Sequence, residues 1–157
     1  MNTQKLSWIL VAIFGASTLF MVYKFVFSGS AEKSADGRLA IHLNVDERDL
    51  VLEEMRTFLE SVQLITQGVA NDDFNSVANA AQKVGRAAQQ EVPGTLVGKL
   101  PLEFKKMGFD THSQFTQIGL DAEQFSDSKH TLQQLSTVLQ NCVACHATFK
   151  FEVDVNQ

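Results

Sequence analysis

Residues 132–149 read LQQLSTVLQNCVACHATF, a stretch in which apolar residues recur every three or four positions. That spacing is the period of an α-helix with one apolar face, so the stretch predicts an amphipathic helix. The same helix carries Cys142-Val143-Ala144-Cys145-His146, the pattern C-x-x-C-H. Cys142 and His146 are four residues apart, and we expect both on the face that turns toward the core.

The C-x-x-C-H pattern is the short motif at which haem is attached covalently to a polypeptide. Two thiols one helical turn apart can each form a thioether with a haem vinyl group, and the adjoining imidazole can bind the iron. Cys142 and Cys145 are the only cysteines, which leaves no further thiol for a structural disulfide or a four-cysteine zinc site. We expect one covalently bound haem c at Cys142 and Cys145, with His146 as an axial ligand. The alternative is that the two cysteines form a redox-active or metal-binding pair. A thioredoxin-like C-x-x-C pair would follow a β-strand, whereas the residues before Cys142 have helical spacing.

Helical periodicity continues through the chain from about residue 46. The pattern predicts a first helix that starts after Asp46 and ends between Gly68 and Asn71, a second capped by Asn71 or Asp72, a third that starts after Asp110, and a fourth capped by Ser128. A longer connection, residues 91–109, joins the second helix to the third. The expected fold is all-α, an antiparallel up-down-up-down four-helix bundle with the haem against its interior.

At these residues the chain resembles the class II cytochromes c, the cytochrome c′ group, which are four-helix bundles with C-x-x-C-H near the end of the last helix. The resemblance covers about residues 46–151. In that family the motif commonly continues as C-x-x-C-H-x-x-Y-R, whereas this chain has Phe149 and Lys150 at the last two positions. The role of a tyrosine hydroxyl is therefore absent here.

The resemblance implies that the sixth iron ligand comes from the first helix. Met55 lies on the apolar stripe of that helix, and we expect it to bind the iron; the register could instead place Leu52 or Leu59 there. Arg48 and Arg86 are candidates for contact with the haem propionates. His112 is expected as a polar residue in the first turn of the third helix.

Residues 6–27 form an apolar segment long enough to cross a bilayer core of about 30 Å. Trp8 and Tyr23, the only residues of their kinds, bracket it like an interfacial aromatic belt. This favours a membrane anchor over residues 1–27, although Gly29-Ser30-Ala31 would also suit cleavage of a signal peptide. We expect a tether over residues 28–45 and a haem domain over residues 46–157.

These features predict a monohaem c-type cytochrome that carries single electrons and is not an enzyme. Because c-type haem is attached outside the cytoplasm, we expect the protein on the periplasmic side of the bacterial inner membrane, anchored by its N-terminal segment. If that segment is cleaved, we expect the protein to be soluble in the periplasm. The expected partners are redox proteins, in particular membrane-bound respiratory complexes. The net charge of −5 argues against nucleic acid, and the oligomeric state, a homodimer included, stays open. Two alternatives are a five-coordinate binder of nitric oxide or carbon monoxide, and a sensor or subunit with a structural haem.

Overall fold

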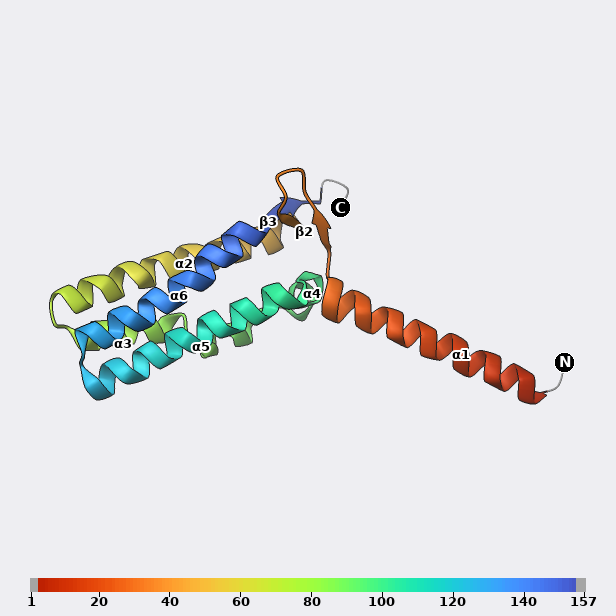
Figure 1. Cartoon of the computed structure of the whole chain (residues 1–157), viewed down its shortest axis with the longest axis horizontal. Coiled ribbons are helices and arrows are strands. Elements are labelled where there is room, and N and C mark those ends of the chain that lie inside the picture. Colours follow the sequence, from red (N-terminus) through yellow and green to blue (C-terminus); the bar gives the residue numbers. More distant parts are fainter. Residues whose placement is uncertain (1–2, 155–157) are drawn as a thin grey trace.

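The computed structural model describes residues 3–154, apart from the side chains of residues 3, 90 and 91. The described chain is mostly helical, as the sequence predicts, with a small sheet at one end of the helical body (Figure 1). Its elements in chain order are α1 (Thr3–Val22), the π-helix η1 (Tyr23–Ser28), β1 (Ala31–Lys33), β2 (Leu39–Leu43), α2 (Val45–Ala70), α3 (Phe74–Lys83), the 3-10 helix η2 (Arg86–Glu91), α4 (Gly94–Lys99), α5 (Leu102–Phe125), α6 (Ser128–Thr148) and β3 (Phe149–Val153).

Side-chain caps fix where the long helices begin. The Asn44 side chain accepts a hydrogen bond from the backbone N–H of Glu47, whose carboxylate accepts one from the N–H of Asn44, so α2 starts in a capping box. Asp73 caps α3 and Asp127 caps α6. The expected caps, Asn71 or Asp72 and Ser128, are therefore each wrong by one or two residues.

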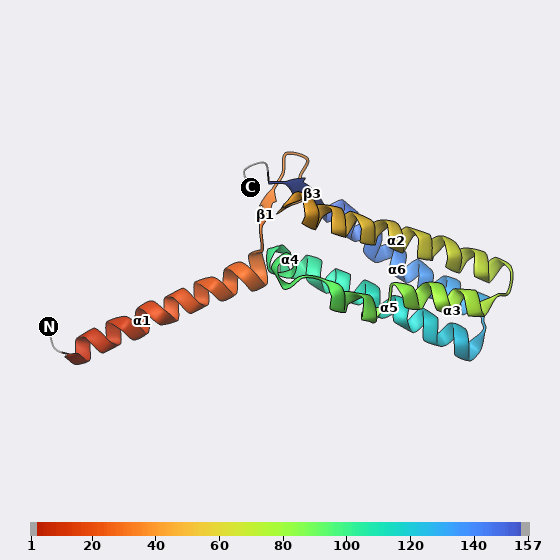
Figure 2. The ribbon, with the colours of Figure 1, turned by 180° about the vertical axis from the view of Figure 1, so that it is seen from behind.

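The helices α2, α3, α5 and α6 share a central cluster of buried side chains. Ile65 of α2, Val77 of α3, Phe115 of α5 and Val138 of α6 are fully buried in it. At about 1.5–3 kcal/mol for each large apolar side chain removed from water, this cluster is a principal source of stability for the helical body. Figure 2 shows the four helices from behind.

The buried face of α6 differs from the stripe that the helical spacing predicted, which consisted of Leu132, Leu135, Leu139, Cys142, His146 and Phe149. Thr131, Leu135 and Val138 are buried, whereas Leu132 and Leu139 are exposed. Both stripes have helical spacing and share Leu135, so the period alone could not choose between them. The actual stripe is turned toward α5, where Gln134 donates a hydrogen bond to Asp121.

The helix α5 starts at Leu102 and so is longer than the predicted third helix, which starts after Asp110. Pro101 is the residue before the first turn of α5, with φ of −67°, the value that the proline ring fixes, and it makes no side-chain cap. The long connection shortens accordingly and contains η2 and α4. His112 consequently lies in the interior of α5 and is buried, not in a first turn.

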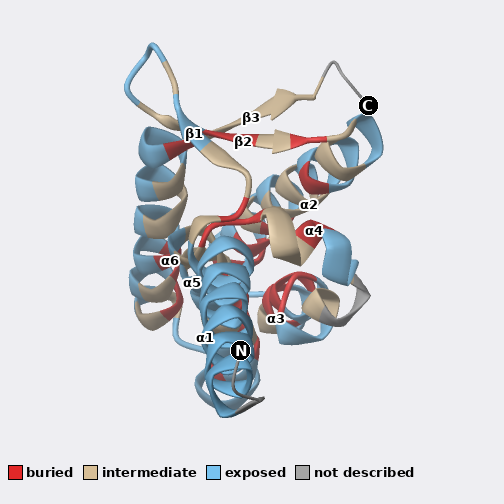
Figure 3. Ribbon diagram, turned by 90° about the vertical axis from the view of Figure 1, so that its right-hand side faces the viewer, coloured by how far each residue is buried: buried red, intermediate tan, exposed pale blue. Residues whose placement is uncertain are grey.

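The segment expected as a tether, residues 28–45, instead contains two strands. β1 pairs antiparallel with β2, and β2 pairs in parallel with β3, with Leu39 opposite Phe149. Ile41 and Leu43 of β2 are fully buried against the helices, which shows why this segment is folded (Figure 3). Because β2 directly precedes α2 and β3 directly follows α6, the pairing joins the start of α2 to the end of α6.

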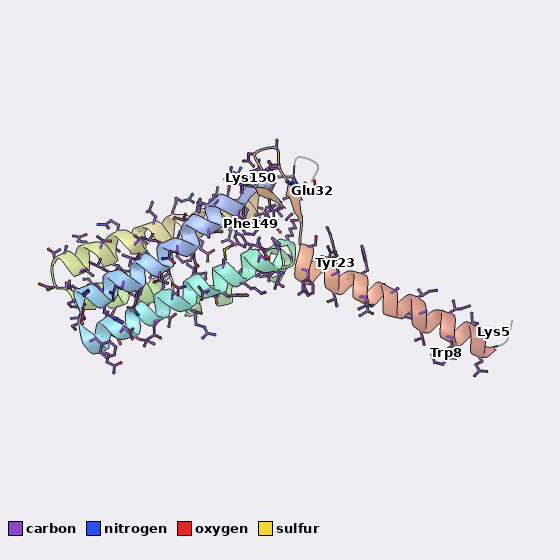
Figure 4. The ribbon with its side chains drawn as sticks, in the orientation of Figure 1. Lys5, Trp8, Tyr23, Glu32, Phe149 and Lys150 are labelled. Atoms are coloured by element: carbon purple, nitrogen blue, oxygen red, sulfur yellow. The ribbon has the colours of Figure 1, made fainter. Side chains whose placement is uncertain are left out.

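The helix α1 and η1 project from the helical body and are exposed throughout residues 4–27. Residues 4–28 form a helix long and apolar enough to span a membrane, and a signal sequence near an N-terminus has the same character. Trp8 and Tyr23 lie toward its two ends (Figure 4). At its junction with the body, the N–H and the hydroxyl of Ser30 both donate to the carbonyl of Lys99.

Candidate functional site

The motif Cys142 to His146 forms the last turns of α6, next to the sheet. Both cysteines are half-buried free thiols. The side chain of Asn141, one residue earlier, donates to the Asp110 carboxylate at 2.7 Å and to the Thr111 hydroxyl at 3.4 Å. These bonds hold this end of α6 against α5 and so fix the direction in which the two thiols point.

Cys145 packs against a second apolar cluster, which we call the sheet-end cluster. Its buried members come from the sheet, α2 and α4: Ile41, Leu43, Val51, Leu96, Leu100 and Phe149. Met55 of α2 and Met107 of α5 also pack against this cluster, each half-buried. The structure therefore brings Met55 and Cys145, predicted to serve the same haem, to one apolar cluster.

The apolar surroundings keep both thiols protonated. Burial and the neighbouring Cys142 thiol raise the pKa of Cys145 to about 11. Burial also raises the pKa of Cys142. A thiol with a raised pKa is a poor nucleophile and a poor zinc ligand near neutral pH, because the thiolate is the reactive form. This environment argues against a free redox pair.

His146 is exposed, and the expectation that it faces the core is wrong for the structure described. Each residue turns the helix by 100°, so around the axis of α6 Cys142 lies between Cys145 on one side and His146 on the other. The core lies on the side of Cys145. Within residues 3–154, no hydrogen bond or ion pair engages the His146 imidazole, and the Arg38 guanidinium donates to the His146 backbone carbonyl at 3.4 Å. The ring can thus bind a metal without losing a partner.

Two cations lie beside the motif: Lys150, which the sequence pattern includes, and Arg38, which the sequence did not single out. Arg38 pairs with Asp36 at 2.8 Å, and Lys150 lies 3.8 Å from the same carboxylate. Arg38 belongs to the segment predicted as a tether, so only the pairing of β2 with β3 brings it to His146. No signal in the local sequence could have found it.

Arg48 and Arg86, the two arginines expected to contact the haem propionates, lie at different positions along the length of the helical body. Arg48 is in the first turn of α2, at the sheet end, and pairs with Asp49 at 2.7 Å. The backbone N–H of Arg86 donates to Thr116 at 2.9 Å. Thr116 is about 9 Å further along α5 than Asp110, which marks the level of Cys142. Of the two, only Arg48 shares the end of the molecule that holds the motif.

The other residues considered for the position of Met55 at the iron either have polar partners or are exposed. The Nδ1 atom of His112 lies 2.8 Å from the carbonyl oxygen of Val84, and its Nε2 lies 3.3 Å from the Glu54 carboxylate. Both ring nitrogens thus have partners. Leu52 and Leu59, the alternatives to Met55 in register, are exposed. Met55 is the inward-facing residue of the three.

A cavity of about 420 Å³ adjoins the sheet-end cluster. It lies between α2, η2, α4 and α5, and Val51, Leu96, Leu100 and Phe104 belong to both its wall and the cluster region. Among the described residues, no three His, Cys, Asp or Glu side chains come together as a metal site of their own.

The donor set fits a c-type haem in its chemistry: two free thiols one turn apart, an unengaged imidazole beside them, and a thioether on the same apolar cluster. The outward direction of His146 is the one departure. Comparison of the chain with protein-family models, with curated proteins and with solved structures finds no match.

Proposed function

We propose that this chain is a monohaem c-type cytochrome of the class II type, tethered to a membrane and carrying single electrons. In this proposal α2, α3 with η2 and α4, α5, and α6 form an antiparallel four-helix bundle. The observation that carries the proposal is the C-x-x-C-H motif on α6, with Cys145 and Met55 on one apolar cluster.

Each residue has a defined task. Cys142 and Cys145 hold haem c through thioethers, and His146 and Met55 bind its iron. The bound haem supplies one-electron redox chemistry. Met55 supplies a soft thioether, which favours the reduced metal more than a second imidazole would. The sheet-end cluster keeps water from that side, and Arg38, Lys150 and Arg48 offer cations for carboxylate groups at the sheet end, whereas Arg86 lies further away.

The proposed location is the periplasmic face of a bacterial inner membrane, with α1 and η1 as the anchor. Ala31, the last residue of the candidate cleavage site, is paired with Ile41 in the sheet, so the segment that cleavage would free is integrated into the fold. Redox proteins of the membrane, such as respiratory complexes, are the proposed partners because the junction keeps the sheet end of the body close to the anchor.

A second candidate function is a five-coordinate binder of nitric oxide or carbon monoxide. The cavity beside the sheet-end cluster favours it, because a gas-binding iron needs open space near its free position. In that case Met55 would be a packing residue only.

Visible spectra of the oxidised and reduced protein, with and without carbon monoxide, separate the two. The electron carrier should be low-spin in both oxidation states and take up carbon monoxide poorly. A high-spin spectrum that changes fully on addition of carbon monoxide would contradict ligation by Met55 and support the gas binder.

A further inference from the structure

The cavity between α2, η2, α4 and α5 exists because α3 is short. α3 ends at Lys83, and Gly85 then passes so close to α5 that a Cβ there would lie 2.7 Å from the Thr116 hydroxyl. The chain continues as η2 instead of as a full helix, which leaves the space between α2 and α5 unfilled. Its volume of about 420 Å³ is in the range of small-molecule sites.

Two apolar and two charged side chains surround the mouth of the cavity. Leu50 of α2 and Phe109 of α5 line it and are exposed, at 41% and 52%, and Glu53 and Lys83 are exposed in the same wall. Further inside, Leu96 is buried. Apolar side chains at the mouth that lead into an apolar interior admit a lipophilic molecule more readily than a hydrated one.

The mouth lies next to the end of the proposed membrane anchor. Lys105, also in the cavity wall, donates to the carbonyl of Phe25 at 3.1 Å, and Phe109 is one helical turn further along the same face of α5. On α4, the Phe25 ring lies within 3.8 Å of the position a Cβ of Gly98 would take. The same walls that enclose the cavity thus hold the anchor where it leaves the bilayer.

The polar groups in the wall favour an uncharged head group. Glu53 and Glu54 both line the cavity, which disfavours a carboxylate or phosphate. Of the two lysines in the wall, Lys83 is paired with Glu60 at 2.7 Å, and Lys105 donates to the backbone carbonyls of Phe25 and Val26. His112 and Glu54 face each other at 3.3 Å. Nδ1 of His112 faces the Val84 carbonyl and so donates to it, and the Glu54 carboxylate beside Nε2 can accept a hydrogen bond from a ligand hydroxyl.

We propose that this cavity binds a neutral, membrane-soluble ring compound with hydrogen-bonding oxygens, of the quinone and hydroquinone class, with its ring among the apolar walls and an oxygen at His112 and Glu54. The proposal rests on the membrane anchor proposed above and does not require the haem.

Gly108 allows a direct test, because it lines the cavity and a Cβ added there meets nothing within 4 Å. Gly108→Leu should fill the space while improving the helix propensity of α5. Gly94→Leu is the matched control, since a Cβ there also meets nothing and Gly94 is exposed outside the cavity. Ala88→Leu, from the opposite wall, is a second filling variant should Gly108→Leu fail to fold.

The probe is an azido-substituted decylbenzoquinone, photolysed with the full-length protein in lipid nanodiscs and mapped by peptide mass spectrometry. Label should fall within residues 50–57 and 83–112. It should compete with unlabelled decylbenzoquinone but not with palmitate, and drop about tenfold in the filling variants while the control matches wild type. A protein that elutes free of the nanodisc contradicts the anchor and this proposal with it. An anchored protein labelled equally with and without Gly108→Leu, or displaced equally by palmitate, contradicts the ligand site alone.

Discussion

The Cys145 thiol lies in an apolar environment that lowers its reactivity as a nucleophile. Its neighbours are apolar side chains of the sheet-end cluster, and its pKa is raised to about 11 by burial and by Cys142. Thioether formation would remove the titrating group altogether. In the haem-free chain, the same environment leaves a measurable signature.

We expect Cys145 of haem-free protein to react slowly with iodoacetamide. With a pKa raised to about 11, only about one thiol in a thousand is thiolate at pH 8, and the rate should rise about tenfold per pH unit until the pH reaches that value. Time-resolved peptide mass spectrometry measures the rate, with the urea-unfolded chain as reference. Equal rates in folded and unfolded protein at pH 8 would show that the thiol is not shielded.

At Met55, substitution separates iron ligation from packing. Met55→Leu conserves volume and should cost less than about 1.5 kcal/mol of stability. The haem should remain bound, lose the near-infrared band of ferric iron bound to methionine sulfur, become high-spin and take up carbon monoxide.

Met107→Leu is the matched control, since Met107 is half-buried against the same cluster. Its spectrum should equal that of the wild type. An unchanged spectrum in Met55→Leu would make Met55 a packing residue, and loss of the band in Met107→Leu would move the ligand to α5.

Among the elements, the sheet was the least visible in the sequence. β2 is only five residues long, LAIHL, and sits among polar and glycine residues, so its alternation is too short to outweigh the polar composition around it. Its pairing with β3 joins residues more than 100 positions apart, which no local pattern records.

The helices were more predictable, with instructive limits. α2 follows its predicted apolar stripe and ends at Ala70 as expected, but it starts at Val45, two residues earlier than predicted, after a cap at Asn44. α5 starts earlier than predicted, at Leu102, because the proline and glycine residues at positions 93, 94, 98 and 101 led us to expect one long connection there. On α6 the motif was placed correctly at the end of the helix, but two overlapping stripes left its rotation undecided, and the inward residue beside Cys142 is Cys145 instead of His146.

The junction element after η1 depends on glycine at position 29. Gly29 has φ of 60°, and a Cβ there would overlap the carbonyl oxygen of Lys99, which is backbone and cannot move aside. Gly29→Ala should therefore lower the free energy of unfolding by about 3 kcal/mol or more.

Gly37→Ala provides the comparison, because Gly37 has φ of 89° but a Cβ there meets nothing within 4 Å. Gly37→Ala should therefore lower the free energy of unfolding only by the cost of the left-handed backbone conformation, about 1 kcal/mol. Urea denaturation of the detergent-solubilised chains, followed by circular dichroism, measures both. Equal losses in the two variants would mean that the contact with Lys99 contributes nothing.

On the scale of the whole molecule, an exposed apolar helix is joined firmly to a folded body. The N–H of Ser30 donates to the Lys99 carbonyl of α4, and Gly29 lies against the same carbonyl. Lys105 holds the end of η1, and the Lys99 ammonium pairs with Glu47 at 2.6 Å. Burial alone would raise the pKa of Glu47, but the hydrogen bonds from Lys99 and from the N–H of Asn44 hold that pKa below its usual value. The body is thus oriented relative to the anchor by folded contacts.

We expect the mature protein to retain residues 6–27. It should fractionate with membranes, resist extraction by high salt, and dissolve only in detergent, because no described residue of the body covers this apolar surface. N-terminal peptide mapping of the purified protein provides the check. A chain that begins after Ala31 and is recovered from the soluble fraction would establish cleavage.

Covalent attachment of haem at Cys142 and Cys145 is the central claim, and one tryptic peptide reports on it. Cleavage after Lys129 and Lys150 releases residues 130–150, which contain both cysteines and His146 and no internal lysine or arginine. After expression with c-type maturation factors and extraction with acidified acetone, this peptide should carry the mass of one haem and absorb in the Soret region. The bare peptide mass, with all haem in the acetone, would contradict the account.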